Sequence, residues 1–357
     1  MNLLTRYLGR EIYLSIALVF AALIALFAFL DLIHELNVMQ DQYHIGYVLM
    51  FVALTIPGHI YELFPVAVLV GTIFALVQMA SSSELTIYRA SGASLWQMMG
   101  ALFKIALPLV ALSFAFSEFV APPSERLAQQ LRLKAQNAQV SLKEFRSGVW
   151  VKDELSFVNV KNVMPDTSLL NIDIYRFDES YRLQSITHAG EAHFVEQGLW
   201  RLDDVRETRF SRQGINIEEM DARQWESALN PGILSVLLVV PEQMSAYDLY
   251  QYSAHLKENR QQSARYEIAM WNKLVYPFAL LVMMILALPF ASYHRRSGGI
   301  SGMVFMGIAL GLVFHFVGRL FASLGALNNW QPLFSATAMT GLFLLLGMAL
   351  LWWTERR

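Results

Sequence analysis

The sequence contains no cysteine among its 357 residues, and it has few charged residues. The first absence excludes disulfides, thiolate metal sites and cysteine nucleophiles. Charged residues make up 16% of the chain and hydrophobic residues 55%, whereas soluble domains have about 25% charged and about 45–50% apolar residues. The net charge is −2, so no basic excess favours nucleic acid as a partner. Any part outside a membrane must be stable through its own packed core.

Motifs of the common enzyme sites are also missing. The chain has no G-x-x-x-x-G-K-[ST] loop for nucleotide phosphates, no H-E-x-x-H pair and no glycine-rich dinucleotide fingerprint. His188 and His193 are five residues apart on an alternating segment, so they would point to opposite faces of a strand. The sequence therefore predicts no catalytic residue, no metal site and no cofactor bound by this chain.

The hydrophobic residues are concentrated in blocks, several of which reach the roughly 20 residues that cross a bilayer. We expect an integral membrane protein with six helices, near residues 12–34, 50–80, 98–120, 268–292, 300–324 and 332–353. The first block is longer than a signal-peptide core and no cleavage site follows it, so we interpret it as an uncleaved span. Pro57, Gly58 and Pro65 interrupt the second, which favours an interfacial piece followed by a kinked span.

Basic residues predict the orientation of these helices. The loops near 35–49 and 325–331 contain no Lys or Arg. The other side carries Arg6, Arg10, Arg89, Arg295, Arg296, Arg356 and Arg357. Short cytoplasmic loops are enriched in Lys and Arg, so both termini are expected in the cytoplasm. Trp330, Trp352 and Trp353 occur where an interfacial aromatic belt would lie.

The interval from about 124 to 265 then lies outside the membrane. It begins with the helix-prone run "SERLAQQLRLKAQNAQ", and after Gly148 apolar and polar residues alternate between turns. Alternation broken every eight to twelve residues predicts an antiparallel sandwich or barrel. Residues 244–267 are amphipathic and lead back to the membrane as a helix. The predicted domains are helices 1–3 (1–122), the external β domain with flanking helices (123–265) and helices 4–6 (266–357).

A short polar segment, "SSSELTIYRASGAS" at residues 81–94, separates the second and third hydrophobic blocks. Ser81 and Glu84 have the spacing of a capping box, and Gly92 is placed to end a helix. One interpretation is a solvated connector that lies on the headgroups. The other is a docking helix that inserts into a groove of a cytoplasmic partner.

Four segments together resemble one family. They are this polar helix, "IPGHIYELFPVAVLVG" (56–71), "SEFVAPPSERLAQQLR" (117–132) and "RYEIAMWNKLVYPFALLVMMILALPF" (265–290). In order and with this topology they resemble the LptF/LptG permeases of lipopolysaccharide export, the G-type more than the F-type. The resemblance covers essentially the whole chain. It implies an α-helical membrane protein of six transmembrane helices, 3+3, with an inserted periplasmic β-jellyroll-like domain.

The resemblance also implies a multi-pass protein of the bacterial inner membrane and a set of partners. These are a cytoplasmic LptB-like ATPase dimer that uses ATP and Mg²⁺, an LptF-like partner permease, an LptC-like single-span protein, an LptA-like periplasmic bridge, lipopolysaccharide and membrane lipid. The polar helix would be the coupling helix that contacts the ATPase, through Glu84, Leu85, Tyr88, Arg89, Ala90 and Gly92.

Ionisable residues at membrane depth are costly and mark candidate sites. Asp31, His34 and Glu35 lie at the outer end of the first helix, with Asp31 and Glu35 on one face. Glu35 either snorkels to the interface or faces a cavity, while the deeper Asp31 requires a partner. Some G-type relatives carry a lysine shortly before this aspartate, but "LFAFLD" (26–31) offers no cation.

The fifth helix carries His315 and Arg319 toward the same outer side, and its Gly307–Gly311 step permits close backbone approach. Such a stripe is either static packing or, by resemblance, part of a lateral gate in which helix 5 of one permease faces helix 1 of the other. We hypothesise that Asp31 and Arg319 each meet a residue of the partner permease there.

Two arginines follow the third helix, on the side from which the lipid would leave. Arg126 and Arg132 could hold its phosphates by charge-assisted hydrogen bonds, and Arg132 matches a basic position of the family. Solvation at the surface is the alternative for both. The predicted substrate-cavity or gate residues are therefore Asp31, His34, Arg126, Arg132, Gly307, Gly311, His315 and Arg319.

The sequence predicts the permease subunit of an ATP-driven lipopolysaccharide extractor, which is not itself an enzyme. Two alternatives stay open: the F-type role in the same complex, and a membrane scaffold with a periplasmic β binding domain. A transporter should co-purify with an ATPase through residues 81–94, whereas a scaffold should tolerate loss of Glu84.

Overall fold

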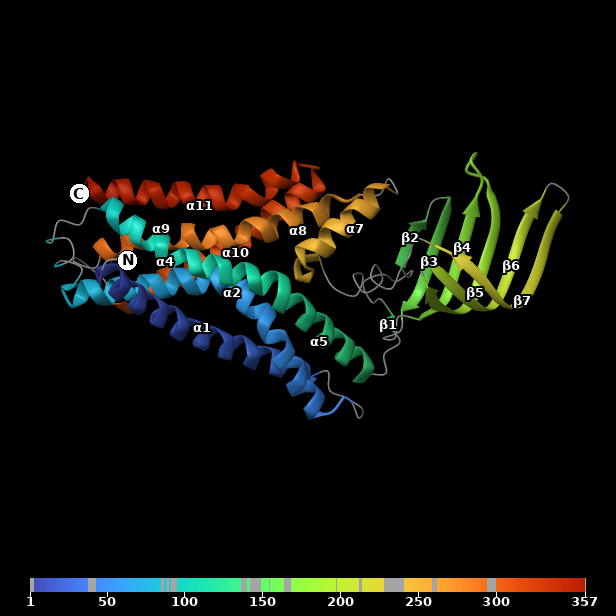
Figure 1. Cartoon of the computed structure of the whole chain (residues 1–357), viewed down its shortest axis with the longest axis horizontal. Helices are drawn as coiled ribbons and strands as arrows, with labels where there is room; N and C mark the ends of the chain where they lie inside the picture. The colour runs from blue at the N-terminus through green and yellow to red at the C-terminus, as the bar shows by residue number, and fades with distance from the viewer. Residues whose placement is uncertain are drawn as a thin grey trace.

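The computed structural model is elongated, with a helix bundle at one end and a curved β-sheet at the other (Figure 1). The first and last helices both have their free ends at the end of the bundle farthest from the sheet. The structure describes residues 3–37, 43–84, 87, 90, 95–135, 140–141, 149–153, 155–163, 168–196, 198–211, 214–227, 241–258, 262–293 and 300–356.

Six spans predicted from the hydrophobic blocks are confirmed in the part of the chain that the structure describes. They are formed by α1 (Leu3–Asn37), α2 (Ile45–Ser81), α4 (Leu95–Ala115) with η1 (Phe116–Val120) and α5 (Ala121–Ala135), α8 (Ala264–Val275) with η3 (Tyr276–Phe278) and α9 (Ala279–Tyr293), α10 (Ile300–Leu327) and α11 (Pro332–Glu355).

The second span is one continuous helix of 37 residues, so the interfacial piece and the span predicted for this block belong to a single helix. Figure 1 shows that α2 changes direction along its length, as the predicted kink requires. Pro57 and Pro65 both lie inside α2, where each removes a backbone hydrogen bond. The helix persists because it is the centre of the bundle: 78% of its most apolar window is buried, and it packs against α1, α5, α9 and α10. Tertiary packing outweighs the local preference.

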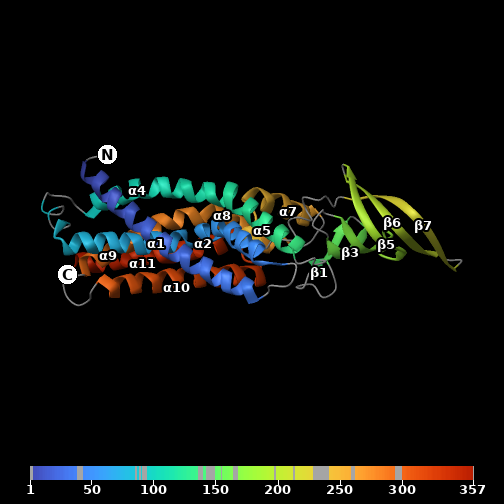
Figure 2. The same cartoon turned by 90° about the horizontal axis from the view of Figure 1, so that it is seen from below.

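The first span, unlike the second, lies at the edge of the bundle and is mostly exposed. Only 6% of the most apolar window of α1 is buried, and α1 packs mainly on α2. At that contact a Cβ on Gly71 would lie 2.7 Å from the Cα of Ile16, so glycine is what allows the two backbones to approach. Figure 2 shows α1 along one side of the bundle. Its exposed apolar residues include Leu14, Leu18 and Phe29.

The third span contains a π-helical turn, η1, and continues without a break to Ala135. The N–H of Ala121 donates to the carbonyl of Phe116, five residues earlier. A π turn inside an α-helix leaves a neighbouring carbonyl without its regular partner, and such turns recur at functional sites. This turn carries Ser117 and Glu118, which become important below.

The inserted antiparallel β domain is confirmed. Its strands are β1 (Val140–Ser141), β2 (Val149–Asp153), β3 (Ser156–Val163), β4 (Leu169–Phe177), β5 (Leu183–Glu196), β6 (Leu199–Ser211) and β7 (Gly214–Glu226). The described strands form one sheet in which β3 to β7 follow each other in order, because turns such as Asp178–Arg182 join consecutive neighbours.

One face of this sheet carries the domain's apolar core. Val160, Ile172, Ala189 and Val205 lie on four adjacent strands in register and are nearly inaccessible to solvent. Trp200 packs beside them and approaches Trp225. One face of the curved sheet thus forms a continuous, buried apolar core.

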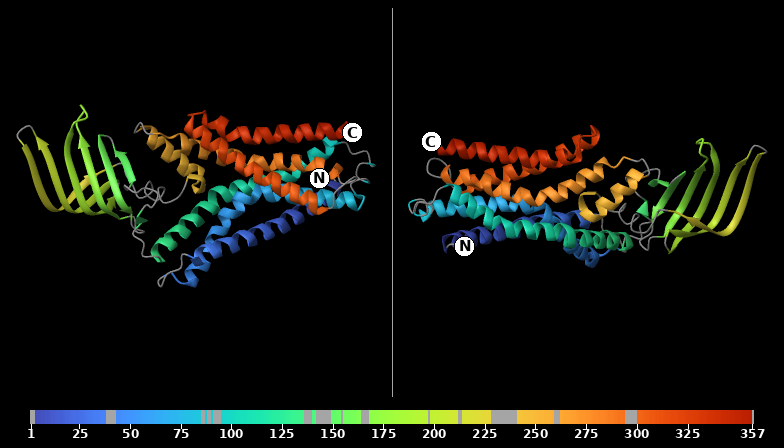
Figure 3. Two further views of the ribbon diagram at one scale, coloured as in Figure 1. Left: turned by 180° about the vertical axis from the view of Figure 1, so that it is seen from behind. Right: turned by 45° about the horizontal axis from the view of Figure 1, so that its top comes forward.

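The chain returns to the bundle through η2 (Pro241–Gln243) and α7 (Ala246–Glu258), which pairs with α8. Met244, Leu249 and Leu256 form a small core with Ala269 of α8. Figure 3 shows α7 at the end of the bundle that faces the sheet. The polar residues of the spans are found at this same end.

Candidate functional site

A polar cavity of about 250 Å³ lies where α1, α2, α5 and α8 meet, at the end of the bundle nearest the sheet. Four acidic residues of these helices, Asp31, Glu35, Glu62 and Glu125, line it. Its other polar walls are formed by His34, Thr55, His59, Arg132, Glu242, Gln243 and Lys273. Since charged groups at membrane depth are costly unless paired, the pairing of each one decides what the cavity can do.

Asp31 has partners within its own chain. The Nε2 atom of His59 lies 2.6 Å from Asp31 Oδ2, and the hydroxyl of Thr55 donates to the same oxygen at 3.2 Å. Both partners come from α2, so this contact joins the first two spans. Sequence reasoning missed His59, although a histidine in the "IPGHIYELF" segment at the depth of Asp31 was the available signal.

Glu35 is buried and does not snorkel to the interface. It is 2% exposed, its carboxylate lies 3.2 Å from Nη2 of Arg132, and it accepts a hydrogen bond from the hydroxyl of Tyr43 at 3.0 Å. Burial and this hydrogen bond to Glu35 raise the pKa of Tyr43, so it remains a donor. Snorkelling would leave Arg132 and Tyr43 without their acceptor, which explains why the carboxylate turns inward.

Arg132 is therefore not a fully solvated residue. Its side chain is 27% exposed, and its guanidinium pairs with Glu35 and lies 5.3 Å from the centre of the Phe51 ring. His34 is exposed at the mouth of the cavity, on the helix that carries Glu35. The structure thus brings together Asp31, His34 and Arg132 of the predicted cavity residues.

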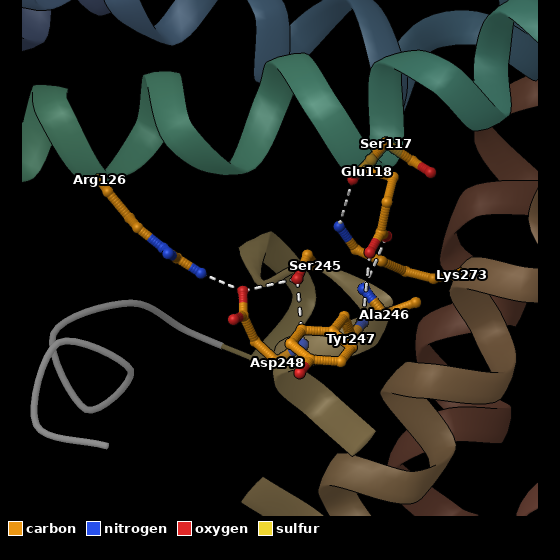
Figure 4. A network of polar contacts seen from close by, with 8 residues as sticks. All are labelled: Ser117, Glu118, Arg126, Ser245, Ala246, Tyr247, Asp248 and Lys273. Atoms are coloured by element: carbon orange, nitrogen blue, oxygen red, sulfur yellow. Dashed lines mark hydrogen bonds and ion pairs between the residues drawn. The ribbon is translucent and has the colours of Figure 1, made fainter. Parts of the chain in front are cut away.

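Arg126 lies outside this cavity and forms an ion pair with Asp248 of α7 (Figure 4). Asp248 also belongs to the start of α7, where the hydroxyl of Ser245 donates to its carboxylate at 2.6 Å and accepts from its N–H at 3.0 Å. Arg126 thus ties α5 to the helix that follows the β domain. Sequence reasoning could not identify Asp248, which is 122 residues away.

The Gly307–Gly311 step packs inside the chain. A Cβ on Gly307 would lie 2.8 Å from Ile73, and one on Gly311 would lie 2.8 Å from Val66. Both contacts are with α2, so these glycines hold α10 against the central helix and do not face outward. Of the two interpretations of this stripe, the structure places the glycines in static packing within the chain.

Beyond these glycines, α10 turns other residues outward. Arg319 is exposed and forms no ion pair with any described residue, and His315 is partly buried. The outward surface of α10 is otherwise apolar, with Phe305 at 72% exposed and Phe316 at 65%. A cation on such a helix either snorkels to the membrane interface or meets an acidic or polar partner.

The segment at 81–94 is described only in part. Leu85, Tyr88, Arg89 and Gly92 lie outside the described residues, whereas Ala90 and Ile87 are helical and exposed. Glu84 accepts hydrogen bonds from the hydroxyl of Tyr7 on α1 and from that of Ser82, both at 3.0 Å.

The predicted capping box between Ser81 and Glu84 does not form. Ser81 is still the last residue of α2, and its hydroxyl donates to the carbonyl of Gln78 at 2.7 Å. Ser83 has a left-handed φ of +63°, and its carbonyl accepts from the N–H of Ile87. The next helical turn therefore begins two residues later than the pattern predicts.

Among the described residues, no group of three or more His, Asp or Glu side chains is arranged to hold a metal ion. His188 instead contacts Asp173 at 2.7 Å, on the outer face of the sheet. The polar groups at the end of the bundle are arranged in pairs that join helices.

A whole-chain comparison decides what kind of protein has this architecture. The sequence profile of the family described as "Lipopolysaccharide export system permease LptF/LptG" matches residues 6–353. The chain belongs to this family. It is 32% identical over 358 residues to lipopolysaccharide export system permease protein LptG of Haemophilus influenzae, across 100% of this chain and 99% of that protein. It is equally similar, 32% over 353 residues and 98% of both chains, to LptG of Escherichia coli strain K12.

The predicted family and fold class are confirmed by this match and by the six apolar helices with an inserted sheet. As a member of the LptF/LptG family, this chain is a permease of the lipopolysaccharide export system. As a permease, the chain is a transmembrane subunit of the transporter and not itself an enzyme. It is a multi-pass protein of the inner membrane. It works in a complex with other Lpt components.

Proposed function

We propose that this chain is the G-type permease of an ATP-driven complex that extracts lipopolysaccharide from the outer leaflet of the inner membrane. The full-length match to two proteins named LptG supports the G-type role over the F-type. The extracted lipid passes to a periplasmic bridge for delivery to the outer membrane. The partners are an LptF-like permease, an LptB-like ATPase dimer, an LptC-like single-span protein and an LptA-like bridge.

The proposed orientation places the β domain in the periplasm and both termini in the cytoplasm. Arg6, Arg10 and Arg356 support it, because they occupy the ends of α1 and α11 farthest from the sheet. Positively charged residues are retained on the cytoplasmic side. The cavity with Asp31 and Glu35 then lies at the periplasmic end of the spans.

The ATPase docks on the segment at 81–94, with Glu84 and Ala90 as described contact residues. Ile87, 69% exposed, supports a docking surface because an apolar side chain there gains from a partner's groove. The hydrogen bond from Tyr7 to Glu84 supports a path from this segment into α1. ATP and Mg²⁺ are used by the ATPase, and this chain binds no cofactor.

Alternating access arises between two permeases that face each other through their least covered helices. The outward apolar surfaces of α1 and α10 support this arrangement, and Arg319 offers a charge to the partner permease there. When ATP closes the ATPase dimer, these helices narrow the space between the two permeases and expel the acyl chains toward the sheet. The apolar face around Trp200 receives them.

The observation that carries this proposal is the match over the entire chain, β domain included. Proteoliposomes that contain the chain, its partner permease and the ATPase should transfer lipopolysaccharide to a soluble bridge protein only with ATP. Glu84→Ala should reduce transfer per ATP hydrolysed, whereas Glu226→Gln, an exposed carboxylate of β7, should not. A scaffold would give no ATP-dependent transfer, and a chain that pairs with LptG but not with LptF would have the F-type role.

A further inference from the structure

The π turn of the third span holds the start of α7, the helix that follows the β domain (Figure 4). Both carboxylate oxygens of Glu118 accept backbone N–H groups of α7: Oε2 from Ala246 at 2.8 Å and Oε1 from Tyr247 at 3.2 Å. The N–H groups in the first turn of a helix have no partners within it, and the helix dipole favours an anion there. Glu118 thus caps α7 from another helix.

A buried cation fixes the same turn from the other side. Lys273 of α8 is 4% exposed, and its ammonium donates to the carbonyl of Ser117 at 3.1 Å, next to Glu118. It also lies 5.4 Å from the centre of the Tyr61 ring on α2. A buried ammonium is costly without such contacts, so Lys273 is held there by the carbonyl that the π turn makes available.

A third contact lies two turns farther along the same helix. Arg126 pairs with Asp248, and eight residues of helix separate it from Glu118, about 12 Å at 1.5 Å per residue. The first turn of α7 is therefore attached to the third span at two separated points, which restrains its direction as well as its position. We call these contacts of Glu118, Lys273 and Arg126 the joint. Since α5 precedes the β strands and α7 follows them, the joint links the two segments that connect the bundle to the β domain.

We propose that Glu118 and Lys273 are positioning residues of lipid export: they fix α7 to the third span, so that movements of the bundle reach the β domain. This inference rests on the proposed function. Glu118 acts on the helix and not on the lipid, because a carboxylate repels the phosphates of lipopolysaccharide. Its loss should therefore separate ATP hydrolysis from transfer of the lipid, without weakening the binding of the lipid.

The test uses the full complex in proteoliposomes and measures ATP hydrolysis and lipid transfer to the bridge protein together. Glu118→Gln retains the size of the side chain but offers one carbonyl oxygen to two donors. Loss of one hydrogen bond to a charged group shifts the equilibrium between attached and detached α7 about tenfold. We therefore expect the lipid transferred per ATP to fall about tenfold, while the rate of ATP hydrolysis stays within about twofold. Glu118→Asp should restore part of the loss, and Glu226→Gln should behave as wild type.

A distance measurement tests the joint directly. The chain has no cysteine, so Phe119→Cys and Tyr250→Cys, both at exposed positions, can be spin-labelled as a pair. The distance distribution should be narrow in the otherwise unchanged chain and broad with Glu118→Gln. A narrow distribution in both chains would overturn the inference.

The remaining outcomes are distinguishable. Unchanged transfer per ATP in Glu118→Gln, or an equal loss of hydrolysis and transfer, would overturn the role of the joint and leave the proposed function intact. Absence of ATP-dependent transfer by the unchanged complex would instead remove the proposed function, and the inference with it.

Discussion

The carboxylate of Glu35 and the guanidinium of Arg132 lie 3.2 Å apart, although 97 residues of sequence separate them. This ion pair joins the end of α1 to α5 across the polar cavity, and the hydroxyl of Tyr43 donates a second interaction to Glu35. Apart from its packing on α2, the first span has few contacts with other helices. The Glu35–Arg132 pair attaches its outer end to α5, and the Asp31–His59 contact attaches it to α2.

Removing Arg132 should therefore destabilise the chain. Arg132→Gln leaves the buried carboxylate of Glu35 without its cation, which costs about 3 kcal/mol. Thermal unfolding of the detergent-solubilised chain should show a lower Tm, while Arg132→Lys should recover part of the loss. The double variant Glu35→Gln/Arg132→Gln should be less destabilised than the sum of its single variants. Additive losses would show that the two side chains do not interact.

The contact between α10 and α2 predicts a sharp difference between two glycines of one helix. Gly311→Val places a branched side chain where a single Cβ already lies 2.8 Å from Val66, and overpacking of this kind costs about 1–3 kcal/mol. Gly302→Val is the matched control, because a Cβ there meets nothing within 4 Å. The Tm of Gly311→Val should fall clearly below that of Gly302→Val. Equal values would place Gly311 away from the helix contact.

Arg319 predicts a contact beyond this chain. Arg319→Gln should reduce the amount of partner permease that co-purifies and lower ATP-dependent lipid transfer. The reason is that an acidic or polar residue of the partner permease then loses the guanidinium that it contacts. Lys104→Gln removes another exposed cation, from α4, and should leave both measurements unchanged. Normal pairing and transfer in Arg319→Gln, and in Asp31→Ala, would refute the hypothesis that these two residues meet the partner permease.

The β domain should lose stability in acid through Glu207. Burial favours the neutral form of this side chain, but hydrogen bonds from Arg209 and Arg223 outweigh burial, so its pKa lies below the ordinary 4.5. A lowered carboxyl pKa contributes stability that is fully present above pH 4.5 and is lost as pH falls through the folded-state pKa. Tryptophan fluorescence should report this loss, since Trp200 and Trp225 lie in the same sheet.

Glu207→Gln provides the control for that prediction. The variant should be less stable than the unchanged chain near neutral pH, and the difference between the two should shrink as pH falls below 4.5. A difference that stays constant over this range would mean that the ionised carboxylate contributes nothing to the fold.

Much of the architecture follows from local sequence patterns. Runs of about 20 apolar residues predict the six spans, and period-2 alternation after Gly148 predicts the strands, because both patterns report burial along a regular backbone. The alternation could not predict the order of the strands, which depends on pairing between distant segments. Nor could Pro57 and Pro65 reveal that α2 stays continuous, because its neighbours in the bundle, and not its own residues, stabilise it.

The candidate site divides in the same way. Sequence alone determined which side chains are unusual at membrane depth, since the cost of an ion in an apolar segment is a local property: Asp31, Glu35 and Arg319 were evident from it. Only the tertiary structure decided their partners. Asp31 meets His59, Glu35 meets Arg132 and Glu118 meets α7, because ion pairs and helix caps form between groups that folding brings together across long stretches of chain.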